Sequence, residues 1–322
     1  MSVPALGVEN LSVEFRTRSG TVRALENVSF AVGKGETIAL VGESGSGKSV
    51  TAYAVMGILD PAGRVTAGKA MLGGLDLLAA SPDELAKARG REIAMIFQNP
   101  RTALNPILPV GRQIADVLLR HADITRKDAP AKAVDLLRAV GITDPARRAN
   151  AYPFEMSGGM CQRVMIAIAL AAKPSLLIAD EPTTGLDVTT QAVIMDLIGE
   201  LAGEIGMATI FITHDLALAA QRAANIAVMH AGHIVELAPT RELFEHARHP
   251  YTAELIAATP DTAADLDELA SIPGSLPDLR RADLPPCRYS ERCPRKVAQC
   301  DQPLPAPVLG SPHIVACWNP LS

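Results

Sequence analysis

The sequence contains few aromatic residues and no long run of uncharged apolar residues. Phe, Trp and Tyr make up 3% of the 322 residues, so a core must be built mainly from Ala, Val, Leu and Ile. The longest apolar candidate, 164–172, falls well short of the ~18–20 residues that a membrane-spanning helix needs. Residues 1–4 lack the basic and apolar regions of a secretion signal. We therefore expect a cytoplasmic protein that meets a membrane only through partners.

The chain also lacks an excess of basic charge. Its net charge is −5, whereas a protein that binds nucleic acid in general needs a basic face to neutralise phosphates. Apolar residues make up 48% of the chain and charged residues 20%, as in a globular protein with a well-buried core. The length allows one large domain with a smaller one beside it.

Two kinds of strand pattern occur. Residues 11–15 and 27–32 alternate apolar and polar positions, which is typical of half-exposed antiparallel strands. Residues 37–41, 176–179 and 209–213 are apolar runs followed by polar residues, which is typical of a parallel sheet covered on both faces. Residues from about 100 to 172 show mainly helical spacing. We therefore predict an α/β fold with a parallel core sheet, an N-terminal antiparallel subsheet and an inserted helical subdomain.

A glycine-rich loop follows the first of the buried strands. It matches the phosphate-binding pattern G-x-x-x-x-G-K-[ST] in full and precedes a predicted helix. The glycines let the backbone wrap phosphates, Lys48 neutralises the β and γ oxygens, and the Ser49 hydroxyl is a ligand for Mg²⁺. The residues expected to contact nucleotide are Gly42, Glu43, Ser44, Gly45, Ser46, Gly47, Lys48, Ser49 and Val50.

Four polar residues at the ends of other predicted strands are candidates for ATP hydrolysis. Asp180 is expected to hold Mg²⁺, and Glu181 to orient or deprotonate the attacking water. His214 is a candidate for contacting the γ-phosphate and for holding the water and Glu181 in register. Gln98 is a candidate for contacting Mg²⁺ or the water. The predicted catalytic residues are Glu181, His214, Gln98 and Lys48, and the predicted Mg²⁺ ligands are Ser49, Gln98 and Asp180.

A second glycine motif, Ser157-Gly158-Gly159, precedes an apolar helix. A small hydroxyl and uncovered N–H groups at a helix start favour an anion such as a terminal phosphate. The chain therefore carries a second predicted phosphate site in addition to the first loop.

The order of these motifs along residues 1–240 resembles the ATP-binding subunit of an ABC transporter: phosphate loop, Gln98, Ser157-Gly158-Gly159, Asp180-Glu181, Asp187 and His214. The resemblance implies a P-loop ATPase cassette with its helical subdomain at about 100–172, and a C-terminal extension at 241–322. It also implies that two cassettes pair head to tail. Ser157, Gly158 and Gly159 would then close onto ATP held by a partner, with Asp187 bridging the two sites.

Further motifs narrow the subfamily. Residues 154–160 and His249-Pro250-Tyr251-Thr252 look like those of oligopeptide/dipeptide importer ATPases, a group that includes nickel importers. The resemblance implies an ATPase that powers import of dipeptides or oligopeptides from the cytoplasmic face of the inner membrane. Implied partners are two permease subunits, an external substrate-binding protein and a second cassette, with a heterodimer favoured over a homodimer. Cys161 stands where Arg is more usual, and we expect it beside the interface between the cassettes.

Three other functions compete with this one. An importer of nickel or another small solute has the same ATPase. A soluble ABC ATPase acting on nucleic acid or ribosomes usually has two cassettes, a coiled coil or a zinc insertion, and none is present here. A regulatory subunit without hydrolysis is disfavoured because Lys48, Asp180, Glu181 and His214 are intact.

The Pro-rich tail carries four of the five cysteines, Cys287, Cys293, Cys300 and Cys317. Disulfides are not expected in a cytoplasmic chain. Zinc sites usually use tight pairs of cysteines, and the tail has none. Four thiolates on irregular backbone suit a [4Fe–4S] cluster, and the resemblance to peptide-importer ATPases points the same way. Zinc and four unliganded thiols are the alternatives, with His313 as a substitute ligand.

Overall fold

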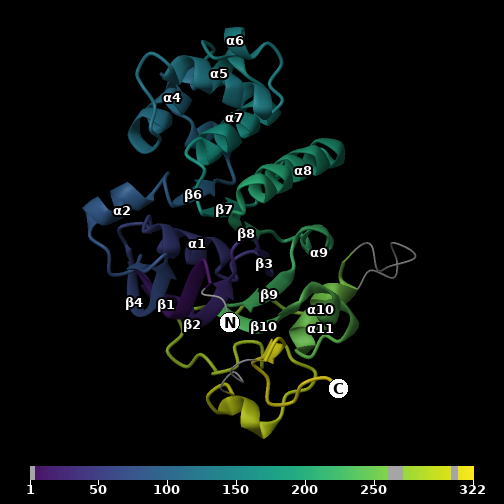
Figure 1. Cartoon of the computed structure of the whole chain (residues 1–322). Coiled ribbons are helices and arrows are strands. Elements are labelled where there is room, and N and C mark those ends of the chain that lie inside the picture. The colour runs from purple at the N-terminus through teal and green to yellow at the C-terminus, as the bar shows by residue number, and fades with distance from the viewer. Residues whose placement is uncertain (1–3, 260–270, 306–310) are drawn as a thin grey trace. The chain divides into compact units, whose positions relative to one another are not determined.

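A computed structural model of the chain describes residues 4–259, 271–305 and 311–322. It divides into two compact units, which are described separately (Figure 1). Unit 1 comprises Met1–Val32, Thr37–Ala79 and Phe211–Ser322. Unit 2 comprises Gly33–Glu36 and Ala80–Ile210.

An antiparallel sheet lies at the start of unit 1. It contains β1 (Leu6–Thr17), β2 (Gly20–Val32), β4 (Gly63–Leu72) and β5 (Leu75–Asp76), in the order β2-β1-β4-β5. Alternate side chains such as Leu11 and Val13 are fully buried, as period-two burial of one sheet face requires. The predicted antiparallel subsheet is therefore confirmed, with longer strands than the alternation alone indicated.

The remaining strands of unit 1 pair in both directions. Strand β3 (Thr37–Val41) runs parallel to β9 (Asn225–His230), and β10 (His233–Pro239) pairs antiparallel with β9. A short strand of the tail, β11 (Ile314–Val315), pairs with β10. The helices of this unit are α1 (Lys48–Met56), α9 (Leu216–Arg222), α10 (Thr240–Glu245) and α11 (Pro250–Ala257), with a 3-10 turn at Ala298–Asp301.

Unit 2 contains the other predicted buried strands. Strands β6 (Ile93–Ile96) and β7 (Leu176–Asp180) are parallel, and every residue of both is buried. Strand β8 (Ala208–Ile212) begins in this unit and ends in unit 1. Its helices are α2 (Pro82–Ala88), α3 (Pro100–Ala103), α4 (Val110–His121), α5 (Ala129–Ala139), α6 (Pro145–Arg148), α7 (Gly158–Leu170) and α8 (Val188–Ile205), with a 3-10 turn at Pro153–Glu155.

Helices α4 to α7 account for most of the region predicted to be helical. Helix α5 contacts α4, α6 and α7, and α4 also contacts α7 (Figure 1). Ile114 and Leu118, which recur at helical spacing, are both buried in α4. The predicted helical character of residues 100–172 is thus confirmed. Among the described residues, no helix combines the length and apolar character needed to cross a bilayer.

The C-terminal tail is packed into unit 1 through an aromatic cluster. Tyr289 is 1% exposed, and its ring centroid lies 5.2 Å from that of His230 and 5.3 Å from that of Tyr251. Its hydroxyl donates a hydrogen bond to the Glu254 carboxylate. Arg288, beside it, forms an ion pair with Glu26 at 2.5 Å. The tail therefore contributes to the core of unit 1, despite its many prolines.

We predict that removing the Tyr289 ring destabilises this unit much more than removing its hydroxyl alone. Tyr289→Ala should lower the free energy of unfolding by about 3–5 kcal/mol, because it removes a buried aromatic ring. Tyr289→Phe should lower it by only about 1 kcal/mol, since it removes one hydrogen bond. Urea denaturation followed by the fluorescence of Trp318, the single tryptophan, measures both. If both variants lost the same free energy of unfolding, burial of the Tyr289 ring would not be what stabilises the unit.

Candidate functional site

The phosphate loop follows β3 and ends in α1, as predicted. Gly42 has a φ of 145°, and a Cβ there would lie 2.1 Å from the Met229 carbonyl oxygen. Gly47 has a φ of 109°, and a Cβ there would lie 2.7 Å from the Leu25 side chain. Both positions therefore require glycine, because the backbone is left-handed and adjoins other atoms closely.

Lys48 reaches back into the loop that precedes it. Its side chain is buried, and Nζ donates hydrogen bonds to the carbonyl oxygens of Gly42 at 2.8 Å and Glu43 at 3.0 Å. The Ser46 hydroxyl is fully buried and has no hydrogen-bond partner among the described residues. An ammonium held inside a glycine loop, beside an unsatisfied buried hydroxyl, fits the binding of a phosphate chain.

Contacts from far along the chain hold Glu43, the second residue of this loop. The Glu43 amide donates to the Tyr251 hydroxyl at 3.0 Å. Its carboxylate accepts two hydrogen bonds from Arg292, at 2.8 and 3.1 Å. Neither partner was predicted from sequence to have a functional role, although Tyr251 lies in a motif that marks the subfamily.

His214 also belongs to unit 1. It is exposed and lies between Thr213, whose amide donates to the Leu40 carbonyl of β3 at 3.2 Å, and Asp215, which caps α9. His214 therefore follows a strand that borders the one leading into the phosphate loop.

In unit 2 the structure brings together two of the predicted catalytic residues. Because β6 and β7 are parallel neighbours, the residues that follow them meet at one edge. Gln98 Nε2 donates to Glu181 Oε2 at 2.7 Å, and the Thr184 hydroxyl donates to the same oxygen at 2.8 Å. Glu181 has a φ of 44°, an uncommon backbone conformation for a residue with a side chain. Asp180 is 1% exposed at the end of β7.

The second glycine motif begins α7. Ser157 is exposed and caps the helix, because its hydroxyl accepts a hydrogen bond from the Met160 amide at 3.3 Å. A Cβ at Gly158 would meet no described atom within 4 Å, and one at Gly159 would meet only the Thr190 methyl at 3.9 Å. The packing of this unit therefore gives no reason for two glycines here, which favours close approach by another molecule.

Asp187 caps the neighbouring helix, α8. Its carboxylate accepts hydrogen bonds from the Thr190 amide at 3.0 Å and the Thr190 hydroxyl at 2.6 Å, and these bonds lower its pKa. The methyl of Thr190 is also the group nearest to Gly159. The Ser157 motif and Asp187 are thus adjacent within unit 2.

Cys161 lies inside unit 2, and its place beside a cassette interface stays a prediction. Its side chain is fully buried, its thiol donates to the Pro153 carbonyl at 3.4 Å, and burial raises its pKa. The side chain faces the interior of unit 2, so it is not a surface contact for a partner. The next residue, Gln162, donates to the Pro182 carbonyl at 2.6 Å and ties α7 to the segment after Glu181.

The four tail thiols lie in one neighbourhood of unit 1. The pKa of Cys287 is raised to about 11, chiefly by burial, with smaller contributions from the charges of Cys300, Cys317 and Cys293. Within the described ranges, no three His, Cys, Asp or Glu side chains are placed to hold a metal ion. The side-chain geometry therefore supports neither zinc nor a cluster by itself. His313 lies 2.6 Å from Glu236, so it serves as that carboxylate's partner rather than as a substitute ligand.

Comparisons with known proteins agree with the motifs. Residues 25–184 match the ABC transporter family, and residues 235–300 match the oligopeptide/dipeptide transporter C-terminal region. The chain is 45% identical to the dipeptide transport ATP-binding protein DppD of Bacillus subtilis, over 97% of this chain and 94% of that protein. It is 47% identical to DppD of Escherichia coli strain K12, over 94% and 92%.

Solved structures show the same fold. A dimeric, post-hydrolysis form of the ATP-binding cassette MJ0796, bound to ADP and Pi, has a TM-score of 0.66 and 28% identity, covering 73% of this chain and 99% of that one. The structure of cbiO1 from Clostridium perfringens, part of the ABC transporter complex cbiONQ, has a TM-score of 0.63 and 26% identity, covering 76% and 92%. With its two glycine motifs and its Gln98–Glu181 pair, the chain belongs to the ABC transporter family of ATP-binding proteins and carries the C-terminal region of the oligopeptide/dipeptide transporters.

Proposed function

We propose that this chain is the ATP-hydrolysing subunit of an ABC importer for dipeptides or oligopeptides. Relatives with 45% and 47% identity are named dipeptide transport ATP-binding proteins, and they align with nearly the whole chain. The observation that carries hydrolysis is the hydrogen bond from Gln98 to Glu181, which holds the carboxylate in place at the end of β7. Residues 1–240 form the ATP-binding domain in this proposal, and 241–322 the extension.

The phosphate loop and the proposed Mg²⁺ ligands together hold the phosphates of ATP. The loop from Gly42 to Val50 surrounds the phosphates, and Lys48 neutralises the β and γ oxygens. Ser49, Gln98 and Asp180 are the proposed holders of Mg²⁺, which neutralises negative charge on the phosphates when bound.

Glu181 is the proposed general base. As the oxygen of water forms a bond to the γ-phosphorus, the bond from that phosphorus to the bridging oxygen breaks, and Glu181 accepts the proton of the water. Gln98 positions the carboxylate, and His214 keeps the water and the γ-phosphate in register. The products are ADP and phosphate.

The Ser157 motif is proposed to complete an ATP site on another cassette. Ser157 and Asp187 are exposed, and among the described residues a Cβ at Gly158 would meet nothing within 4 Å and one at Gly159 only the Thr190 methyl. The dimeric form of MJ0796 bound to ADP and Pi supports this reading, since cassettes of this fold do pair. We favour a partner that differs from this chain.

The remaining partners follow from peptide import. They are two permease subunits and an external substrate-binding protein, with this chain at the cytoplasmic face of the inner membrane and no role for nucleic acid. Support comes from the match to the oligopeptide/dipeptide transporter C-terminal region.

We also propose that Cys287, Cys293, Cys300 and Cys317 hold a [4Fe–4S] cluster. In such a cluster each thiolate binds a different iron, so the thiols need not approach a single point as they must around zinc. Support comes from the chemistry of four thiols in one Pro-rich tail, whereas the described side-chain positions bring no three of them around a metal ion. The cluster would stabilise the fold of the tail.

Changing Glu181 to Gln should abolish hydrolysis while preserving ATP binding. Glutamine keeps an oxygen that accepts from Gln98 and Thr184 but cannot take a proton, so the single-turnover rate should fall by about 100-fold or more. The measurement uses the transporter complex with the matching glutamate of the other cassette also changed. Glu204→Gln, on an exposed position of α8, is the control and should behave as wild type. Near-normal hydrolysis by the Glu181 variant would overturn its assignment.

Purification without oxygen tests the cluster. The protein should be brown, absorb broadly in the visible range and contain about four irons per chain. Cys300→Ser should lose the colour, whereas Cys161→Ser, which changes a thiol in unit 2, should keep it. Stoichiometric zinc without iron, or no metal at all, would contradict the proposal.

A further inference from the structure

Glu43 places a negative charge within a loop whose proposed ligand is a polyanion. Its side chain is 29% exposed, so solvent screens it only in part. A carboxylate in this position opposes the binding of phosphate groups unless a cation neutralises it. The Lys48 ammonium donates hydrogen bonds to the backbone carbonyls of Gly42 and Glu43.

Arg292 is placed to supply the missing charge. Its guanidinium binds both oxygens of Glu43, at 2.8 and 3.1 Å, a geometry that lysine cannot reproduce. The side chain is 5% exposed. Its Nε donates to the Pro273 carbonyl at 2.8 Å, which fixes the orientation of the guanidinium plane.

Within the described ranges, the contacts of Arg292 include no second carboxylate. His230 Nε2 lies 3.3 Å from the guanidinium. Burial, and then the charge of Arg292, lower the pKa of His230 to about 3, so its ring is neutral at pH 7. The Tyr289 ring centroid lies 5.6 Å from the Arg292 guanidinium carbon. The charge of Arg292 is therefore directed to Glu43.

Tyr251 holds the main chain of the same residue. Its hydroxyl accepts a hydrogen bond from the Glu43 amide at 3.0 Å, and the tyrosine is fully buried at the start of α11. The tail also covers the loop at Gly45, where a Cβ would lie 3.3 Å from the Leu276 side chain. The backbone and the carboxylate of Glu43 are thus held by separate groups.

We propose that Arg292 and Tyr251 are positioning residues for ATP binding, which makes the C-terminal extension part of the nucleotide site. Arg292 cancels the charge of the Glu43 carboxylate, and Tyr251 fixes the Glu43 backbone, so the loop presents its N–H groups to phosphate without an opposing anion. This inference rests on the proposed function, because it requires that ATP binds at the phosphate loop. If Arg292 served fold stability alone, the same contacts would be present, but the effect of its removal on ATP binding would not depend on the charge of Glu43.

The test is the equilibrium dissociation constant of ATP for the full-length chain. Arg292→Ala should weaken binding by about tenfold, because it leaves the Glu43 carboxylate uncompensated. The double variant Glu43→Gln/Arg292→Ala should recover binding to within about threefold of wild type, since it removes the opposing charge. Arg292→Lys, which keeps the charge but loses the bidentate geometry, should fall between wild type and Arg292→Ala.

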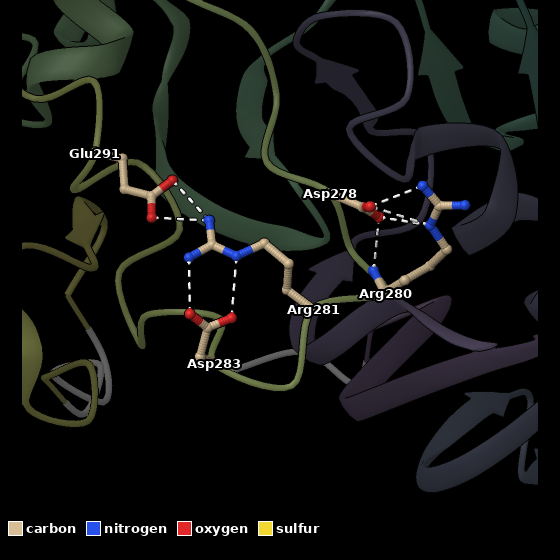
Figure 2. Close-up of polar contacts among 5 residues, drawn as sticks. All are labelled: Asp278, Arg280, Arg281, Asp283 and Glu291. Atoms are coloured by element: carbon tan, nitrogen blue, oxygen red, sulfur yellow. Dashed lines mark hydrogen bonds and ion pairs between the residues drawn. The ribbon is translucent and has the colours of Figure 1, made fainter. Parts of the chain in front are cut away.

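Arg281→Ala is the matched control. Figure 2 shows Arg281 between Asp283 and Glu291, which it contacts at 2.8 to 3.1 Å, so it forms ion pairs as extensive as those of Arg292. Both partners lie in the tail, and neither is part of the phosphate loop. ATP binding by Arg281→Ala should equal that of wild type. Thermal denaturation of every variant shows whether it is folded.

The outcomes separate this inference from the proposed function. If Lys48→Ala abolishes ATP binding but Arg292→Ala binds as wild type, the inference is wrong and the function stands. If the double variant binds as weakly as Arg292→Ala, the charge argument is wrong and the role is structural. If Lys48→Ala does not weaken binding, the proposed ATP site itself is wrong. Should Arg292→Ala fail to fold, Arg292→Lys and the double variant decide between the first two outcomes.

Discussion

An acidic side chain in a loop that binds a polyanion repels the ligand unless a cation neutralises its charge. Glu43 is such a side chain, and two residues from the C-terminal part of the chain hold it. Arg292 lies between Cys287 and Cys293 along the sequence, so the segment that carries these two cysteines also carries the partner of the phosphate loop. The tail therefore connects the predicted cluster region to the nucleotide-binding loop within unit 1.

The two glycine motifs differ in what their glycines do. In the phosphate loop, Gly42 and Gly47 are required by the chain itself, because a Cβ would collide with neighbouring atoms of unit 1. In the second motif, a Cβ at Gly158 or Gly159 would meet no such obstacle. The first motif is a formed loop, whereas the second is an exposed helix start. This difference fits the proposal that the second motif contacts ATP held by another cassette.

The strands, the helical region and the two glycine motifs could be predicted from sequence, because local residue patterns specify them. The sequence pattern placed Gln98 and Glu181 at the ends of strands, and the structure adds that these strands are parallel neighbours, so the two side chains meet. The pairing of Glu43 with Arg292 could not be predicted, because 249 positions separate them and no motif links them. The burial of Cys161 was not predicted either, because a helix that begins at an exposed motif still buries one face, and position 161 lies on it. The boundary proposed at residue 240 stays a prediction.

The most direct test of this account is hydrogen exchange at the amide of Glu43 in nucleotide-free protein. Because this amide donates to Tyr251, it should exchange slowly in the wild type. In Tyr251→Phe, which keeps the ring but loses the acceptor, exchange at Glu43 should be at least about tenfold faster. Fast exchange in the wild type, equal to that in the variant, would contradict the claim that the C-terminal extension holds the phosphate loop ready for ATP.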